Sequence, residues 1–251
     1  MDQVELSPKD KLGQLHDLVS AQNRELVEKL ENALQSAGQE FSLDYLQAGE
    51  INIGNKMIRF SFMLSGEREN KNWQEYLSED FAESIVKALE RIKKSSDDPL
   101  FVDEIVVTNI NFANPNSGEP VNGVTLTNME NTAQNSIVLF ANAFSSVDYR
   151  GEVPGVSHLE GTVTHEYGHC LDNAFGADLR KMWVERLPWQ YDEESDTFSY
   201  NGDDQDFVTT YARVSPTEDL AESYALYLLD KEKLAEVSPK RKEFFDAFFA
   251  S

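Results

Sequence analysis

The sequence predicts an α+β protein in which a mixed sheet precedes a long helix that carries a paired-histidine motif. Segments rich in β-branched and aromatic residues lie in the middle of the chain. Segments with helical spacing of apolar residues lie toward both ends. The 251 residues, 40% of them hydrophobic, can build a sizeable core and suit one large domain, or one domain with an extension.

The amino-terminal part predicts two helices with a hairpin between them. Apolar residues recur with helical spacing across residues 9–36. Alternating apolar residues on both sides of Gly54-Asn55 indicate a β-hairpin that extends to about Leu64. A second helix is expected from Trp73 to Lys94.

The segment SSDDP at residues 95–99 is typical of a loop and marks a candidate boundary. We expect an amino-terminal α/β extension of unknown role at residues 1–96. The domain that carries the histidine motif is then expected at residues 97–251.

The second half of the chain predicts strands first and helices afterwards. Strands are expected at Phe101–Ile110 and Ser136–Phe140, with a loop rich in Asn, Gly and Pro between them. A helix is expected from about Ser157 to Phe175, with Gly176 as its carboxyl-terminal cap.

The remainder predicts an irregular acidic stretch at Tyr191–Asp206. Two closing helices are expected after it, from Pro216 to about Lys233 and from Pro239 to about Phe249.

The charge excludes some classes of partner. The chain has 45 acidic and 22 basic residues, a formal net charge of −23. Such a surface repels phosphate backbones and anionic lipid head groups, so nucleic-acid binding is not expected. Membrane insertion is not expected either, because no apolar run approaches the roughly 20 residues that cross a bilayer.

We expect a soluble protein. The amino terminus lacks a basic flank followed by an apolar block, which argues against a secretory signal. The chain as given indicates a cytoplasmic protein, and a secreted protein whose signal has been removed is the alternative. A single cysteine, Cys170, excludes an internal disulfide framework. The sequence leaves the oligomeric state open.

The motif HEYGH at residues 165–169 predicts a metal site. His165 and His169 stand four residues apart, so on a helix they share one face. Two imidazoles at that spacing suit a catalytic zinc, which keeps one position for water. Glu166 can accept a proton from that water. The residues therefore predict one zinc ion per chain, with Glu166 as general base.

The third protein ligand has two candidates. The longer pattern HExxHxxGxxH is absent, so a third histidine does not follow the motif. Glu218 and Glu222 share one face of the next predicted helix, and either carboxylate could bind zinc. Ser215, Pro216 and Glu218 also fit the first positions of a helix, where Glu218 would only cap it.

The motif together with the later tyrosine and glutamates resembles the gluzincin peptidases related to anthrax lethal factor and the clostridial Pro-Pro endopeptidase. In that group a tyrosine precedes the ligand glutamate by seven residues, and a second glutamate follows it by four. Tyr211, Glu218 and Glu222 have this spacing. The resemblance covers about Thr162–Asp172 and Tyr211–Leu229. It implies a zincin-like metallopeptidase fold with a glutamate-bearing helix after the HExxH helix.

The resemblance also implies roles for these residues. Glu218 would be the third zinc ligand, and Glu222 would hydrogen-bond a ligand histidine and fix its tautomer. Tyr211 would stabilise the oxyanion or protonate the departing group.

Other residues of the motif helix have more than one interpretation. Asp172 could support a ligand from behind, or it could be an exposed helix residue. Cys170 points about 100° away from His169 and indicates core packing. Tyr167 and Gly168 fill variable motif positions and are expected to pack.

Two further segments could have functions. The strand Ile137–Phe140 could be a sheet edge to which substrate adds, but its unbroken apolar run favours a buried strand. The acidic residues of 191–206 could bind calcium. They lack the spacing of a recognised calcium loop, which favours a solvated loop.

These observations predict a zinc metallopeptidase of gluzincin type, an endopeptidase that hydrolyses peptide bonds in a peptide or protein substrate. The alternatives are a zinc-stabilised binding or virion-associated protein without turnover, and a toxin-like peptidase with narrow specificity.

Overall fold

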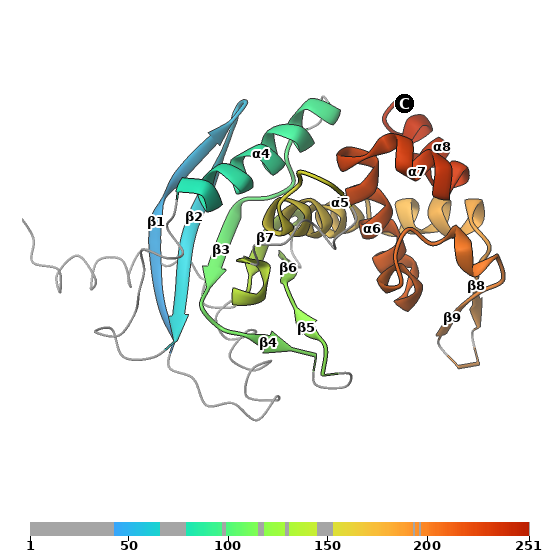
Figure 1. Cartoon of the computed structure of the whole chain (residues 1–251), viewed down its shortest axis with the longest axis horizontal. Coiled ribbons are helices and arrows are strands. Elements are labelled where there is room, and N and C mark those ends of the chain that lie inside the picture. The colour runs from blue at the N-terminus through green and yellow to red at the C-terminus, as the bar shows by residue number, and fades with distance from the viewer. Residues whose placement is uncertain are drawn as a thin grey trace, which may run out of the picture.

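The computed structural model describes residues 43–65, 79–96, 99–114, 118–128, 131–144, 153–192, 194–195 and 197–250. A sheet lies at one end of this part of the molecule, and a group of helices forms the other end (Figure 1). The helix predicted at residues 9–36 falls outside the described residues. The expected α+β class with a mixed sheet is confirmed.

The sheet has five strands in the order β1-β2-β3-β7-β6. Strands β1 (Leu43–Ile53) and β2 (Lys56–Ser65) pair antiparallel. Strand β3 (Glu104–Thr108) pairs parallel with β2 and with β7 (Asn131–Leu139). Strand β6 (Gly123–Asn128) pairs antiparallel with β7 and forms one edge of the described sheet.

The predicted hairpin at Gly54-Asn55 is confirmed. Ile53 pairs with Lys56, so Gly54 and Asn55 alone form the connection between the two strands. Gly54 has φ of 62°, the left-handed conformation that two-residue hairpin turns require and glycine adopts without a steric cost.

The expected boundary near residue 96 falls between β2 and β3, which are neighbours in this sheet. The division of the chain into residues 1–96 and 97–251 therefore stays a prediction about folding units, while the described strands on both sides of it share one sheet.

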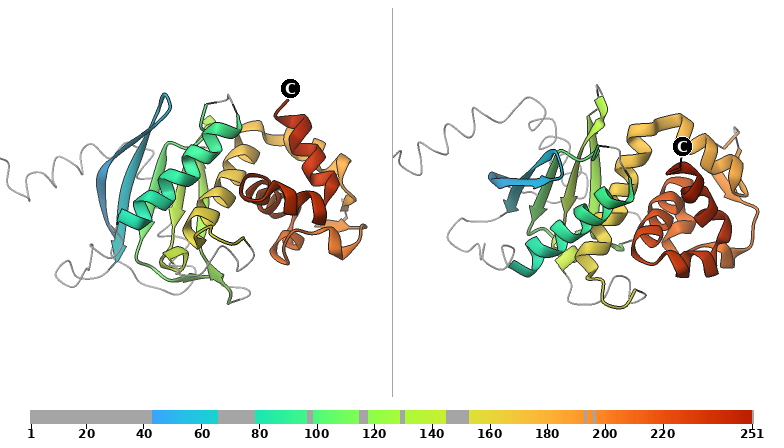
Figure 2. Two further views of the ribbon diagram at one scale, coloured as in Figure 1. Left: turned by 45° about the horizontal axis from the view of Figure 1, so that its top comes forward. Right: turned by 90° about the horizontal axis from the view of Figure 1, so that it is seen from above.

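The core lies between the sheet and the helices α4 (Glu79–Ser95) and α5 (His158–Arg186), which cover one face (Figure 2). The central strands β3 and β7 contribute alternate residues to this face, because side chains of a strand point to opposite sides in turn. The core side chains from the two strands are Ile105, Val107, Ile137 and Leu139. Of the helix predicted at Trp73–Lys94, residues 79–95 are described and helical.

The opposite face carries a second apolar cluster, which contains Val106, Val138 and Phe140. A small hairpin of β4 (Phe112–Ala113) and β5 (Pro120–Val121) packs here. Phe112 stacks on Phe140 with ring centroids 5.1 Å apart. The Asn142 amide donates to the main-chain oxygens of Phe112 and Val121, at 2.9 and 3.1 Å, and so holds both strands of the hairpin.

Two predictions for this region need correction. The strand expected at Ser136–Phe140 begins earlier, at Asn131, and lies between β3 and β6. The buried interpretation of Ile137–Phe140 is therefore correct, and the edge interpretation is wrong. The segment predicted to be an Asn/Gly/Pro-rich loop contains a strand, β6. This strand pairs with β7 along most of its length and takes the edge position.

Helix α5 begins as predicted, but it does not end at Gly176. Ser157 is the N-cap, and its Oγ accepts from the Glu160 main-chain N–H at 3.1 Å. Gly176 has φ of 60° and kinks the helix, which then continues to Arg186. The second half forms because Trp183 is fully buried against the aromatic rings of Phe244 and Phe245.

The acidic stretch is more ordered than predicted. Strands β8 (Trp189–Asp192) and β9 (Thr197–Tyr200) form a hairpin, and the short helices η4 (Asp204–Asp206) and η5 (Tyr211–Val214) follow. In this hairpin Trp189 pairs with Tyr200, and Asp192 accepts from the Ser195 hydroxyl at 2.7 Å.

Three helices close the chain, where two had been predicted. They are α6 (Pro216–Leu229), α7 (Lys231–Val237) and α8 (Pro239–Phe248). Asp230 ends α6 and caps α7, because its side chain accepts from the Lys233 main-chain N–H at 2.9 Å. No helix in the described part of the chain is both long and apolar enough to span a membrane.

A buried ion pair joins α6 to α8. Arg241 donates to both carboxylate oxygens of Asp219 at 2.8 Å, and Trp189 donates to the same carboxylate at 2.9 Å. Asp219 is completely buried, and Arg241 is 1% exposed. Burial raises the pKa of Asp219, although Arg241 opposes this shift.

We predict that Arg241→Ala lowers the free energy of unfolding by about 3–5 kcal/mol, because the Asp219 carboxylate loses its counterion inside the protein. Urea unfolding of the metal-free protein measures this. The control is Lys181→Ala, which removes an exposed ion pair with Glu185 and should cost less than about 1 kcal/mol. Equal effects of the two substitutions would contradict the prediction.

Candidate metal centre

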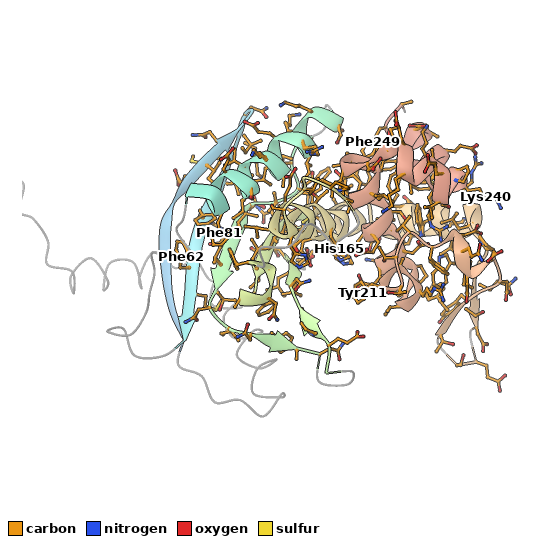
Figure 3. The ribbon with its side chains drawn as sticks, viewed as in Figure 1. Phe62, Phe81, His165, Tyr211, Lys240 and Phe249 are labelled. Atoms are coloured by element: carbon orange, nitrogen blue, oxygen red, sulfur yellow. The ribbon has the colours of Figure 1, made fainter. Side chains whose placement is uncertain are left out.

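The first two candidate ligands lie one turn apart on α5. The ring centroids of His165 and His169 are 4.9 Å apart. His165 is buried, and the His169 side chain is 20% exposed. His165 and Tyr211 lie near each other between the sheet and the carboxyl-terminal helices (Figure 3). The helix therefore presents both imidazoles to one space, as the spacing predicts.

Helix α6 supplies two carboxylates to the same space. Ser215 is its N-cap and accepts from the Glu218 main-chain N–H at 3.1 Å, with Pro216 in the first turn. The Glu218 side chain is free to face the histidines. Its Oε2 lies 3.3 Å from Nε2 of His165 and 3.4 Å from Nε2 of His169.

The second carboxylate contacts the other side of a ligand histidine. Oε1 of Glu222 lies 2.7 Å from Nδ1 of His165. Of the two glutamates that residue chemistry left open, Glu218 faces both Nε2 atoms and Glu222 lies behind one ring. A carboxylate at Nδ1 fixes the tautomer that leaves Nε2 available to a metal.

The close approach of α5 and α6 depends on Gly168. A Cβ atom at this position would lie 2.7 Å from Cα of Ala221, too close for any side chain unless the backbone moves. Tyr167 is buried beside it, and its hydroxyl accepts from the Phe101 main-chain N–H at 3.2 Å. Both variable motif positions thus serve packing, as expected.

The donor set fits a tetrahedral metal. His165, His169 and Glu218 each offer one ligand atom, and these atoms all lie within 4.8 Å of one another. Zinc bonds of about 2.0–2.2 Å put neighbouring ligand atoms of a tetrahedral site about 3.3 Å apart. The distances from Glu218 to the two imidazoles, 3.3 and 3.4 Å, match that spacing. The group could therefore hold a metal ion.

The electrostatics of this group favour a cation. Burial alone would lower the pKa of His165, but Glu222, Glu218 and Glu166 outweigh it and raise that pKa from 6.5 to about 10. Burial alone would raise the pKa of Glu218, but His165 and His169 outweigh it and hold that pKa well below its usual range. Without a metal, a proton on His165 supplies the positive charge.

Glu166 borders a cavity beside the metal-ligating group. The cavity has a volume of about 440 Å³, and its lining residues come from three regions. They are Asn114, Glu119, Pro120, Val121, Asn122 and Gly123 near β6, Thr162, His165 and Glu166 on α5, and Thr210, Tyr211 and Val214 at η5. Glu166 is 4% exposed. A cavity of this volume therefore adjoins the predicted base and one candidate ligand, His165.

Tyr211 lies at the start of η5, where its ring centroid is 6.0 Å from that of His165. It is 36% exposed and lines the cavity. The structure thus brings together the motif residues, Tyr211, Glu218 and Glu222.

Asp172 pairs with an arginine of its own helix and is not the exposed residue that one interpretation expected. It is buried, and both of its oxygens accept from Nε of Arg180, at 2.7 and 2.8 Å. This pair spans the kink at Gly176, so Asp172 stabilises the bent helix. Among the described residues, no hydrogen bond joins Asp172 to His165 or His169, so its expected support of a ligand histidine has no observation in its favour.

Cys170 is buried and free, and burial raises the pKa of its thiol well above the usual value. These properties agree with core packing. The acidic stretch 191–206 contributes to no metal-ligating group among its described residues, because His165, His169 and Glu218 form the one group of this kind in the described part of the chain. The calcium interpretation has no support there.

Two residues beside Glu166 were missed. Gly123 and Thr125 of β6 lie against it, in a segment predicted to be a loop. The letters GVTLTN at 123–128 alternate in polarity and are rich in β-branched residues, a strand signal that could have identified them.

Comparison with known proteins adds no relative: the sequence matches no family model and no curated protein.

We predict that Glu218→Gln weakens zinc binding more than Glu222→Gln does. The first change removes the charge of a residue that faces both Nε2 atoms, and the second alters a contact behind one ring. We expect losses of at least about 100-fold and of about 10- to 100-fold, respectively. Competition with a chromogenic chelator measures both affinities. Glu119→Gln on the cavity rim is the control, and a Glu218→Gln affinity equal to that of the control would contradict the assignment.

Zinc binding should also release a proton. The pKa of His165 is about 10 without metal, so this imidazole is charged at pH 7 and must become neutral to bind. Binding should release about one proton per ion, and the apparent affinity should rise about tenfold per pH unit between about pH 7 and 9. Calorimetry in buffers with different ionisation enthalpies measures this, and a binding heat independent of the buffer would contradict it.

Proposed function

We propose that this chain is a zinc-dependent endopeptidase with a zincin-like fold. The observation that carries the proposal is the convergence of His165, His169 and Glu218 in one group, of which His165 lines a cavity together with Glu166. A protein that used zinc only for stability would have no need of a carboxylate next to the ligands and an open cavity in front of it. Catalytic zinc sites combine three protein ligands with an accessible fourth position.

The ligand set would hold zinc through two imidazoles and one carboxylate. When bound to these residues, zinc would supply a lowered pKa for a water molecule and polarisation of the substrate carbonyl. Glu222 orients His165 from behind, at 2.7 Å from Nδ1.

Glu166 would act as the general base. Its carboxylate accepts a proton from the attacking water and later delivers it to the leaving amine. Because Glu166 is almost fully buried, little bulk water competes for its oxygens. Tyr211 lines the same cavity, and its phenol can donate a hydrogen bond to the developing oxyanion.

Strand β6 is the proposed support for the substrate main chain. It lies at the edge of the described sheet, and its first residue, Gly123, lines the cavity. An extended peptide can add to such an edge through main-chain hydrogen bonds, which bind it without regard to sequence. Among the described residues that line the cavity, Glu119 is the one charged side chain besides His165 and Glu166, so acidic substrate side chains are disfavoured there.

We predict that Glu166→Gln retains stoichiometric zinc and loses peptide hydrolysis by at least about 100-fold, because the ligands are unchanged and the base is removed. Zinc content is measured by elemental analysis. Hydrolysis is measured on casein and on a peptide library, with and without a chelator.

The parent protein in the same assays separates the alternatives. Chelator-sensitive cleavage by the parent and none by Glu166→Gln would support the proposal. A parent that holds zinc and cleaves neither casein nor any library peptide would contradict it and favour a binding protein. Cleavage of a few library peptides without casein would indicate narrow specificity. Glu166→Gln activity equal to that of the parent would exclude this mechanism.

A further inference from the structure

The carboxylate of Glu166 is held by a residue of the edge strand. Oγ1 of Thr125 lies 2.9 Å from Oε2 of Glu166 and 2.8 Å from its main-chain oxygen. The hydroxyl has one proton to donate, and a hydrogen bond to a charged acceptor is stronger than one to a neutral carbonyl. When Glu166 is ionised, Thr125 therefore donates to Oε2.

The second carboxylate oxygen lies beside a residue that has no side chain. A Cβ atom at Gly123 would lie 2.7 Å from Oε1 of Glu166 and 2.8 Å from its Cγ. Any larger residue would push the flexible glutamate side chain out of this place. Gly123 and Glu166 both line the cavity. One face of β6 thus binds Oε2 through Thr125, and at Gly123 it leaves the space that Oε1 and Cγ of Glu166 occupy.

The same face of β6 is fixed to α5 at a second point. Thr127 donates to Oδ1 of Asn135 at 2.8 Å and accepts from the Asn173 side-chain amide. Asn173 lies seven residues, about two helical turns, beyond Glu166 on α5. Since residues two apart on a strand point the same way, Gly123, Thr125 and Thr127 all face the helix.

We propose that Thr125 is a positioning residue for catalysis, which holds one oxygen of Glu166 so that the other faces the attacking water, with Gly123 leaving the space that this orientation needs. The inference rests on the proposed function. A glutamate has three rotatable side-chain bonds, and fixing them before the reaction removes an entropic cost from the chemical step. Thr125 itself is not among the described residues that line the cavity, so its role runs through Glu166.

Three substitutions in the full-length zinc-loaded protein test this role. Thr125→Val removes the hydroxyl and nearly preserves the shape, whereas Thr125→Ser preserves the hydroxyl. Thr127→Val is the matched control, since it removes a hydroxyl from the same strand face without touching Glu166. Measurements are kcat and KM for a cleaved peptide, zinc content and thermal unfolding.

We expect Thr125→Val to lower kcat by about 10- to 100-fold, with KM within about twofold and zinc content unchanged. Thr125→Ser and Thr127→Val should keep kcat within about threefold of the parent value. The proposal would be overturned by a kcat for Thr125→Val within twofold of the parent, by an equal loss in Thr127→Val, or by a loss in Thr125→Ser as large as in Thr125→Val.

Crystal structures separate failure of this proposal from failure of the proposed function. If the parent binds zinc but cleaves no peptide, the proposed function fails, and the position of Glu166 still tests the inference. A carboxylate in the same place in the parent and Thr125→Ser, but displaced in Thr125→Val and in Gly123→Ala, would support it. An unmoved carboxylate in Thr125→Val would overturn it.

Discussion

The close approach of α5 and α6 at Gly168 is the constraint on which the metal-ligating group depends. The backbone of Ala221 fills the space that a side chain at Gly168 would occupy, with Cα 2.7 Å from the ideal Cβ position. Only at this separation do the Nε2 atoms of His165 and His169 come within 3.4 Å of Glu218. A ligand set for a small ion tolerates changes of a few tenths of an ångström in such distances. A side chain at Gly168 would therefore disturb the site without touching any ligand.

The same packing concentrates negative charge. Glu166, Glu218 and Glu222 surround His165 with little solvent access, and each would be unfavourable there without a nearby cation. In the metal-free protein the proton on His165 offsets part of this cost. A divalent ion would offset more of it and would take the place of that proton. Metal binding and folding stability would then be coupled, since an ion that binds only the folded chain stabilises it. The arrangement proposed to support hydrolysis is thus also one that favours a bound cation.

Local features of this site could be predicted from the sequence, and non-local ones could not. The shared face of His165 and His169 follows from helix geometry, and the caps of α5 and α6 follow from single residues. Residue chemistry left both Glu218 and Glu222 open, because the choice depends on the rotation of α6 against α5, which no local pattern specifies; only the family resemblance favoured Glu218. The contact of Thr125 with Glu166 joins residues 41 positions apart, and it depends on the register of β6 with β7. Because glycine, asparagine and proline dominate the segment before β6, that strand was mistaken for a loop.

Helix α6 is also held on a second side, next to the one that faces the histidines. Glu218 and Asp219 are neighbours in sequence, and consecutive residues of a helix point about 100° apart. Glu218 faces the histidines, while Asp219 is buried against Arg241 and Trp189. Arg241 also donates to the main-chain oxygen of Asp206, at 2.9 Å, in the segment that leads to η5 and Tyr211. One guanidinium therefore fixes both the helix that carries Glu218 and the approach of the chain to the tyrosine.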